Sequence, residues 1–257
     1  MKATPKVFIA VFAVALVATA AYAAVLLTEP FAYPDGDLVG NGNWVAHSSG
    51  GNKPVQVVSG VAQYEQSPNS GEDVNTQFAA QPEDATTFAC FDITIPSTGP
   101  LGPANVGDDP IYVAHLKVPA PSFFYNGRVW VQPAQENGNF RFGLTSTSGT
   151  FSNIVSWPVD SFFDVTYKVA VSYDAATGDA KLWVDPADEN DTSITQNGFS
   201  GNAIGEFGLR QASPAGIGAS YYCLVDNIKV AQAFHEACDT PVQIDDTTWG
   251  QVKGIYR

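Results

Sequence analysis

Short runs of alternating apolar and polar residues cover most of this chain and predict β-strands rather than helices. The runs are rich in Val, Phe, Tyr and Thr, and clusters of Gly, Pro, Asn and Asp separate them. This succession is typical of a β-sandwich or a barrel. The predicted strands cover residues 44–47, 54–58, 60–64, 88–95, 111–118, 127–132, 140–144, 165–173, 180–184, 207–211 and 221–230.

The run at 221–230 is the clearest of these strands. Its alternation predicts that Leu224, Ile228 and Val230 face the core. It places Cys223 on the opposite face, together with Asn227 and Lys229. Asp226 interrupts the core face, and we expect it to have a hydrogen-bond partner because burial of an unpaired carboxylate is costly.

Several short motifs follow one another in order between residues 31 and 230. They include Asn41-Gly42-x-Trp44, Gly127-Arg128-Val129, Phe140-x-Phe142-Gly143-Leu144 and Val225-Asp226-Asn227-Ile228. Together they resemble the bacterial secreted concanavalin A-like (laminin-G-like) jelly rolls. The resemblance implies an all-β fold, a two-sheet antiparallel β-sandwich whose concave face often binds glycans. It does not fix the activity, because that family contains hydrolases as well as binding and adhesive modules.

The two ends of the chain differ from the predicted sandwich, which we assign to residues 24–232. Residues 1–23 have a positive start, an apolar run at 7–17 and a small-x-small site at Ala21-Tyr22-Ala23, as in a signal peptide. We therefore expect a secreted, periplasmic or cell-surface protein without a membrane span after cleavage. The tail at 233–257 is predicted to hold a short helix with Trp249, Val252 and Tyr256 on one face.

The charge of the chain disfavours a nucleic-acid partner. The 257 residues include 26 Asp and Glu against 12 Lys and Arg, for a formal net charge of −14. No basic footprint is present to neutralise phosphates. A glycan or a cell-surface component is the expected partner, and no cofactor is required for such a role.

The sequence favours a non-catalytic module over an enzyme. The Glu-x-Asp-x-x-Glu motif that aims two working carboxylates at one sugar is absent. His115 is interpreted as a hydrogen-bonded structural histidine. Two alternatives stay open: a purely structural surface protein, and a glycoside hydrolase or lyase that acts on polysaccharide through a divergent site, for example Glu206 with a loop acid.

One set of polar and aromatic side chains is the candidate glycan-binding face. Sugar rings stack on aromatic side chains, and their hydroxyls need planar polar partners. The candidates, all on the predicted polar faces of central strands, are Arg128, Trp130, Gln132, Arg141, Lys181 and Trp183. If they share one sheet, we expect Trp130 and Trp183 to be exposed on the same face.

Cysteine pairing and calcium are two further expectations. In an oxidising compartment the three cysteines form one disulfide, and we favour Cys90–Cys223 over the alternative Cys223–Cys238 because it closes the longer loop. Weak calcium candidates lie in the acidic loop at 188–192. They are Asp188, Asn190 and Asp191, although the loop lacks the spacing of an EF-hand.

Overall fold

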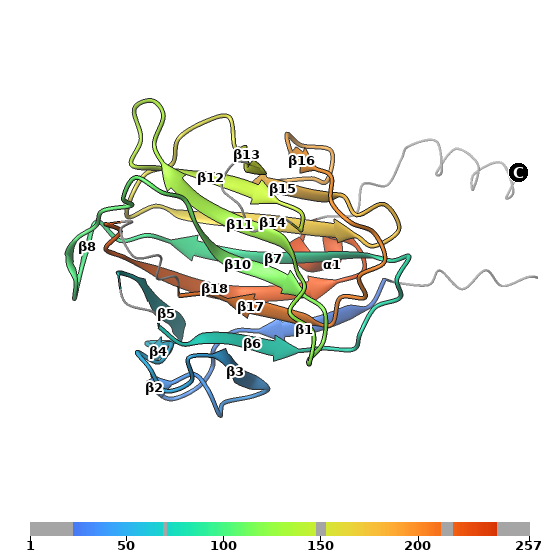
Figure 1. Ribbon diagram of the computed structural model, residues 1–257, viewed down its shortest axis with the longest axis horizontal. Coiled ribbons are helices and arrows are strands. Elements are labelled where there is room, and N and C mark those ends of the chain that lie inside the picture. Colours follow the sequence, from blue (N-terminus) through green and yellow to red (C-terminus); the bar gives the residue numbers. More distant parts are fainter. Residues whose placement is uncertain (1–22, 69–70, 148–152, 212–217, 241–257) are drawn as a thin grey trace, which may run out of the picture.

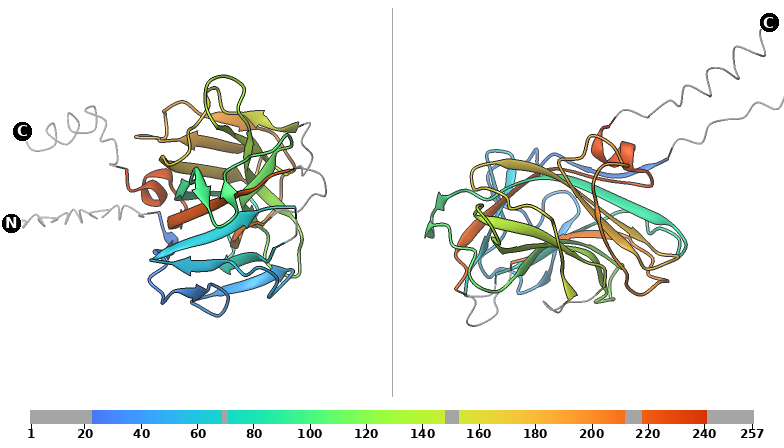
Figure 2. Two further views of the ribbon diagram at one scale, coloured as in Figure 1. Left: turned by 90° about the vertical axis from the view of Figure 1, so that its left-hand side faces the viewer. Right: turned by 90° about the horizontal axis from the view of Figure 1, so that it is seen from above.

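In the computed structural model, two antiparallel β-sheets packed face to face build the molecule (Figures 1 and 2). The structure describes residues 23–68, 71–147, 153–211 and 218–240. Within these residues every strand pair is antiparallel. The expected all-β two-sheet sandwich is therefore confirmed.

The first sheet contains nine strands among the described residues, in the order β16-β15-β14-β7-β18-β5-β4-β2, with β1 paired to β18. Its strands are β1 (Val25–Glu29), β2 (Gly36–Asp37), β4 (Gln56–Val58), β5 (Val61–Gln66), β7 (Thr86–Thr94), β14 (Thr166–Asp174), β15 (Ala180–Val184), β16 (Ile194–Gln196) and β18 (Tyr221–Ala231).

The second sheet has seven strands in the described ranges, in the order β13-β12-β11-β10-β17-β6-β3. Its strands are β3 (Trp44–Ser48), β6 (Asp73–Gln77), β10 (Ile111–Lys117), β11 (Tyr125–Pro133), β12 (Phe140–Thr145), β13 (Val155–Ser156) and β17 (Glu206–Leu209). The Pro- and Gly-rich loop at 96–110 adds a small hairpin of β8 (Thr98–Gly99) and β9 (Gly102–Pro103).

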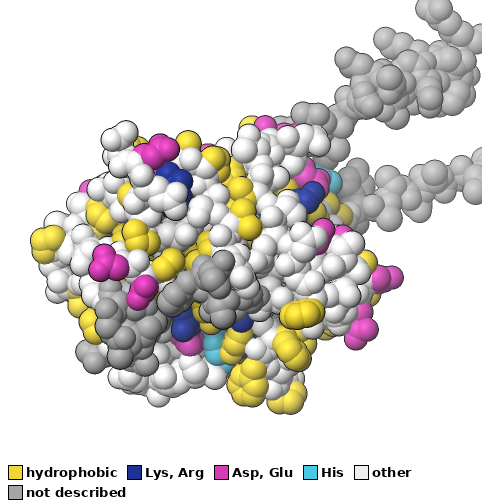
Figure 3. Space-filling view, turned by 45° about the horizontal axis from the view of Figure 1, so that its top comes forward, with side chains coloured by type: hydrophobic (Ala, Val, Ile, Leu, Met, Phe, Trp, Pro, Cys, Tyr) yellow, Lys and Arg dark blue, Asp and Glu magenta, His cyan; other side chains and the backbone are white. Residues whose placement is uncertain are grey.

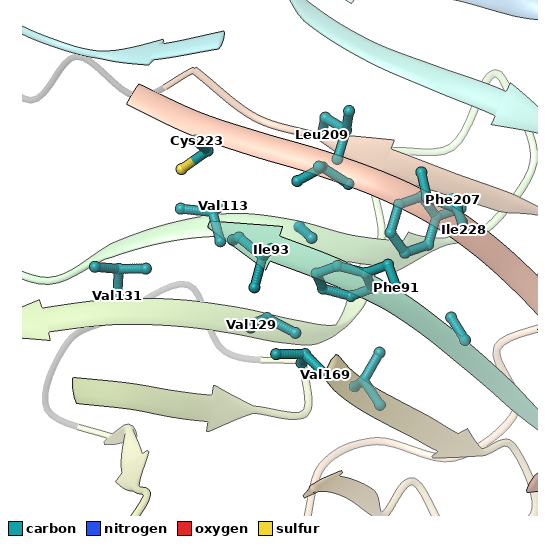
Figure 4. Close-up of a cluster of buried hydrophobic side chains, with 14 of the residues drawn as sticks. Phe91, Ile93, Val113, Val129, Val131, Val169, Phe207, Leu209, Cys223 and Ile228 are labelled. Atoms are coloured by element: carbon teal, nitrogen blue, oxygen red, sulfur yellow. The ribbon is translucent and has the colours of Figure 1, made fainter. Parts of the chain in front are cut away.

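The main core lies between the inner faces of the two sheets (Figure 4). Phe91 of β7 packs edge-on against Phe207 of β17, with ring centroids 5.6 Å apart. Val129 and Val131 of β11 also point into this core, as their alternation predicts. Because these inner positions are apolar, the polar side chains between them are directed to the outer faces of the sheets.

A β-bulge in β18 changes which side chains of this strand face the core. The pairing with β7 shifts between Asp226 and Lys229, and Asn227 has a positive φ of 53°. Before the bulge, Cys223 is buried in the main core (Figure 4), where the sequence pattern placed it on the opposite face. Asp226 has its expected partner, because its carboxylate accepts the Asn227 amide at 2.7 Å.

The predicted disulfides Cys90–Cys223 and Cys223–Cys238 are both wrong: Cys90 is bonded to Cys238, with Cα atoms 5.2 Å apart. Cys90 lies on the outer face of the nine-stranded sheet, whereas Cys223 faces the core between the sheets and is free. The short helix α1 (Phe234–Cys238) packs on that outer face, away from β11 and β12 (Figure 2).

The helix expected around Trp249 and the signal segment at 1–22 lie outside the described residues. No helix in the described part of the chain is long and apolar enough to span a bilayer.

Candidate functional site

The structure divides the predicted glycan-binding residues between the two sheets. Arg128, Trp130 and Gln132 lie on β11 and Arg141 on β12, all in the seven-stranded sheet. Lys181 and Trp183 lie on β15 of the nine-stranded sheet. The six side chains therefore do not form one face, and that part of the prediction is wrong.

Both tryptophans are buried, contrary to the expected exposed pair. Trp130 is 1% exposed, and its indole N–H donates to the Thr145 hydroxyl at 2.9 Å. Trp183 is also 1% exposed and packs against Phe234 of α1, with ring centroids 5.1 Å apart. Neither indole therefore offers a face on which a sugar ring could stack.

Two further predicted residues are occupied by contacts within the protein. Arg141 donates from Nε to Asp160 at 2.6 Å and from Nη1 to Gln135 at 2.9 Å. Gln132 donates to the Phe142 carbonyl at 3.1 Å. These contacts are structural. Of the predicted residues, Arg128 instead belongs to the cluster of aromatic and histidine side chains described next.

An aromatic and histidine cluster occupies the outer face of the seven-stranded sheet. Its members come from three strands: His47 of β3, Tyr112 and His115 of β10, and Tyr125 of β11. The ring of His115 lies 4.8 Å from that of Tyr125 and 5.8 Å from that of Tyr112, measured between centroids. His47 lies 5.7 Å from His115 and 5.8 Å from Tyr125 by the same measure.

Two arginines complete this cluster. The guanidinium of Arg210 lies 4.0 Å from the centroid of the Tyr112 ring, and that of Arg128 lies 5.0 Å from the same centroid. Neither arginine forms an ion pair with a carboxylate among the described residues. In Figure 3, dark blue Lys and Arg atoms and cyan His atoms lie close together in the lower part of the view.

His115 forms the floor of the cluster. It is fully buried, and neither ring nitrogen has a hydrogen-bond partner among the described residues, so the expectation of a hydrogen-bonded histidine is wrong. Gly208 on the adjacent β17 leaves space for the imidazole ring, because a Cβ at Gly208 would lie 2.5 Å from His115 Nε2. Burial, followed by the nearby His47 and Arg128, holds the pKa of His115 well below 6.5, so the ring is neutral.

The more accessible rings of the cluster have displaced pKa values as well. Burial lowers the pKa of His47, and this effect exceeds the opposing effect of Asp73. Burial likewise raises the pKa of Tyr125 above 10.0. At neutral pH the site therefore presents a neutral imidazole beside a protonated phenol, which is the state needed to accept one proton and to donate another.

A buried ion pair anchors one side of the cluster. Glu206 of β17 is 0% exposed and pairs with Lys117 of β10, which is 3% exposed. The carboxylate also accepts the Asn75 amide at 2.8 Å and the backbone N–H of Ala120 at 2.9 Å. Because these groups occupy its oxygens, Glu206 is a structural anchor, and in the described part of the chain it has no loop acid beside it as the alternative hydrolase site would require.

The acidic loop proposed for calcium is held by its own hydrogen bonds. Asp191 accepts the backbone N–H of Ala187 at 2.7 Å, and Asp188 accepts that of Asn190 at 2.8 Å. No group of three His, Cys, Asp or Glu side chains in the described ranges could hold a metal ion. Calcium binding here stays an untested prediction.

Alternation within single strands does not indicate this cluster. Arg210 follows β17 directly, and Tyr112 and Tyr125 lie near the ends of β10 and β11, which pair. Strict alternation along 111–117 would place His115 on the same face as Ile111 and Val113. In the structure His115 packs with Tyr112 instead, because register shifts at 112–116 break the alternation. Strand pairing, rather than alternation within one strand, identifies the group.

Solved structures with a similar fold include lyases and lectins, whereas no protein-family model and no curated protein matches the chain. The alginate lyase Aly36B, solved with an alginate trisaccharide, has a TM-score of 0.58 at 12% identity, with 82% of this chain and 99% of that chain covered. The alginate lyase AlyA1 from Zobellia galactanivorans has a TM-score of 0.46 at 12% identity over 69% and 80% of the two chains. The seed lectin of Lotus tetragonolobus has a TM-score of 0.44 at 11% identity over 76% and 94%. The chain thus has a concanavalin A-like jelly-roll fold, similar to that of the alginate lyase Aly36B.

Proposed function

We propose that the outer face of the seven-stranded sheet binds an acidic polysaccharide and cleaves it by β-elimination. The observation that carries this proposal is the pair of arginines, Arg128 and Arg210, beside Tyr112 without a carboxylate partner. Two neighbouring cations without an anion repel each other. Burial is the main cause of the lowered pKa of Arg128, and the nearby Arg210 lowers it further. The carboxylate of a uronate sugar would relieve this repulsion through charge-assisted hydrogen bonds.

The cluster has the groups that an elimination needs. Neutralisation of the uronate carboxylate by arginine makes the C5 proton of the sugar easier to remove. In the proposed step His47 takes this proton, the electron pair forms the C4–C5 double bond, and the bond from C4 to the glycosidic oxygen breaks. Tyr125 donates its proton to the leaving oxygen. These assignments agree with the lowered pKa of His47 and the raised pKa of Tyr125.

The carboxylates of this face fit hydrolysis less well. A glycoside hydrolase needs two carboxyl groups about 5–9.5 Å apart. The acids beside the cluster are Asp73 and Glu206, and the pairing of β6 with β17 separates them by four strand positions. At about 3.4 Å per residue, that is roughly 14 Å along the strands. The proposal therefore favours a lyase, and the alginate lyases of similar fold support this choice.

We further propose that the protein acts outside the cell. The Cys90–Cys238 disulfide and the predicted signal peptide support this location, because disulfides persist in oxidising compartments. Glycan binding without cleavage is the second candidate function, since the same arginines would hold a uronate in a site that lacks turnover.

The test is to incubate the purified protein with alginate, polygalacturonate and a neutral β-glucan, with and without EDTA. Ultraviolet absorbance detects the unsaturated uronate that only elimination produces, and affinity electrophoresis detects binding. We expect cleavage of an acidic polymer and none of the neutral glucan. Binding without an absorbing product would favour the second candidate, and neither binding nor product with any acidic polymer would overturn both.

Matched variants test the individual roles. Tyr125→Phe should reduce kcat by about 10²–10⁴-fold while the polymer still binds, because only the proton donor is removed. The control is Tyr222→Phe, a half-buried tyrosine of the nine-stranded sheet whose hydroxyl contacts Glu65. Arg210→Gln should weaken binding, whereas Lys181→Gln, which removes an exposed cation of the other sheet, should not. Equal effects in test and control variants would contradict the assigned site.

A further inference from the structure

Two adjacent phenylalanines are exposed at the edge of the candidate site. Phe123 is 75% exposed and Phe124 is 66% exposed, in the loop at 118–124 that connects β10 to β11. Exposed single apolar residues are common, but two neighbouring phenyl rings form a small apolar surface. Nothing in the core or in the elimination step accounts for this surface.

The loop that presents these rings is held in place by hydrogen bonds. The Val118 amide donates to the Phe124 carbonyl at 3.1 Å, which closes the loop on itself. The Ala120 amide donates to Glu206 at 2.9 Å, so the buried Lys117–Glu206 pair fixes the loop to the sheet. Because the loop is already ordered, binding through its rings would cost little additional conformational entropy.

The position of the loop relates the phenyl rings to the cluster. Tyr125, the proposed proton donor, directly follows Phe124, and consecutive Cα atoms are about 3.8 Å apart. In the lower part of Figure 3, a group of hydrophobic side chains lies beside the cyan His atoms. A polymer seated on His47 and Tyr125 would therefore meet the apolar surface within a few sugar units.

We propose that Phe123 and Phe124 form a stacking platform that extends the polysaccharide-binding site beyond the sugar held by Arg128 and Arg210. This inference rests on the proposed function. Sugar rings have an apolar face that packs on aromatic rings, so the platform suits a polymer of any uronate composition. The segment 118–124 has no Lys or Arg, so it offers no cation for the headgroups of an anionic membrane.

The test compares wild-type protein with the double variant Phe123→Ala/Phe124→Ala on the acidic polymer that the wild type cleaves. If each ring contributes an aromatic contact, KM for the polymer should rise roughly 5- to 150-fold, which corresponds to about 1–3 kcal/mol for the two rings together. The kcat should stay unchanged, because the rings do not touch the reacting bond. KM for the shortest oligosaccharide that is cleaved should also stay unchanged. The control is Phe162→Ala, which removes a 49% exposed ring from another loop.

The outcomes separate this inference from the proposed function. If the wild type neither binds nor cleaves acidic polymers, the proposed function fails and the platform fails with it. If the wild type is active and the double variant keeps its KM for the polymer, the platform alone is wrong. The same holds if the double substitution abolishes self-association or vesicle binding of the wild type without changing KM for the polymer.

Discussion

His115 is a neutral, fully buried side chain in the middle of the candidate site, and its surroundings make its protonation costly. Burial opposes a positive charge on this ring most strongly, and the nearby His47, Arg128, Arg210 and Lys117 oppose it further. Its ring edge packs against Tyr125, so it positions the phenol without facing solvent. At the residue scale, the cluster therefore combines His47, whose side chain is 10% exposed, with a fully buried His115 that packs against its neighbours.

This arrangement predicts how stability depends on pH. An unfolded histidine takes up a proton near its ordinary pKa of 6.5, whereas folded His115 does so only at much lower pH. The unfolded state thus binds more protons, and the free energy of unfolding falls as the pH drops below about 6.5 and levels off below the folded pKa. His115→Gln should show a weaker decline over this range, measured as denaturation midpoints against pH. An unchanged pH dependence would contradict a neutral His115.

At the scale of elements, β10, β17 and the following loop are joined by the Lys117–Glu206 pair. Glu206 contacts Lys117 of β10, Asn75 of β6 and the backbone of Ala120. One carboxylate thus connects two neighbouring strands to the loop that holds the exposed phenylalanines. The orientation of that loop depends on the pair, which links the stability of the sheet to the shape of the site.

The pair predicts a distinct pattern in a mutant cycle. Glu206→Gln should lower the free energy of unfolding by about 3–5 kcal/mol, because it leaves the ammonium of Lys117 buried without a counter-charge. Lys117→Met combined with Glu206→Gln should recover a large part of this loss, since no charge then remains buried. Urea denaturation measures both variants. Equal losses in the single and double variants would show that Lys117 reaches solvent in the folded state.

At the scale of the whole molecule, the disulfide connects the end of α1 to the centre of the nine-stranded sheet through residues far apart in the sequence. Cys90 and Cys238 are separated by 148 positions. Cys223 lies in the core between the sheets, where burial raises the pKa of its thiol to about 12. The contact between the two sheets therefore depends on apolar packing, whereas the disulfide lies outside this contact, in the layer formed with α1.

Cys238→Ser should lower the free energy of unfolding by about 2–5 kcal/mol, because the unfolded chain loses a constraint on a long loop. Cys223→Ala is the control that keeps the disulfide. Peptide mapping without reduction should recover Cys90 joined to Cys238, and thiol labelling of the wild type should require unfolding. A peptide joining Cys90 to Cys223 would contradict this pairing.

Alternation along the chain was sufficient to predict the sandwich, and insufficient to predict the site. Strands such as β11 and β14 carry regular apolar positions, so their existence and inner faces followed from period two. The strand β6 was missed because Asp73, Asn75 and Gln77 alternate with only one strongly apolar residue, Val74. Bulges near Asn227 and Val113 reversed the predicted faces of Cys223 and His115.

The predicted glycan face failed for a different reason. Alternation places Trp130 and Trp183 each on the polar face of its own strand, but it does not show to which sheet each strand belongs. That assignment follows from pairing between strands distant in sequence, such as β10 with β17 and β14 with β7. The same pairing brings Arg210 to Tyr112, which no local pattern indicated.

The antiparallel pairing of β1 with the end of β18 also determines which face of the molecule would point outward if the protein were attached to a surface through either end of the sandwich. The amide of Gln232 donates to the carbonyl of Ala24 at 3.1 Å, so the first and last parts of the sandwich lie side by side. Both belong to the nine-stranded sheet and its covering helix, whereas His47, Tyr125 and Arg210 lie on the outer face of the other sheet. An attachment through residues before Ala24 or after Cys238 would be on the side of the nine-stranded sheet, so the proposed polysaccharide-binding face on the other sheet would point away from the surface.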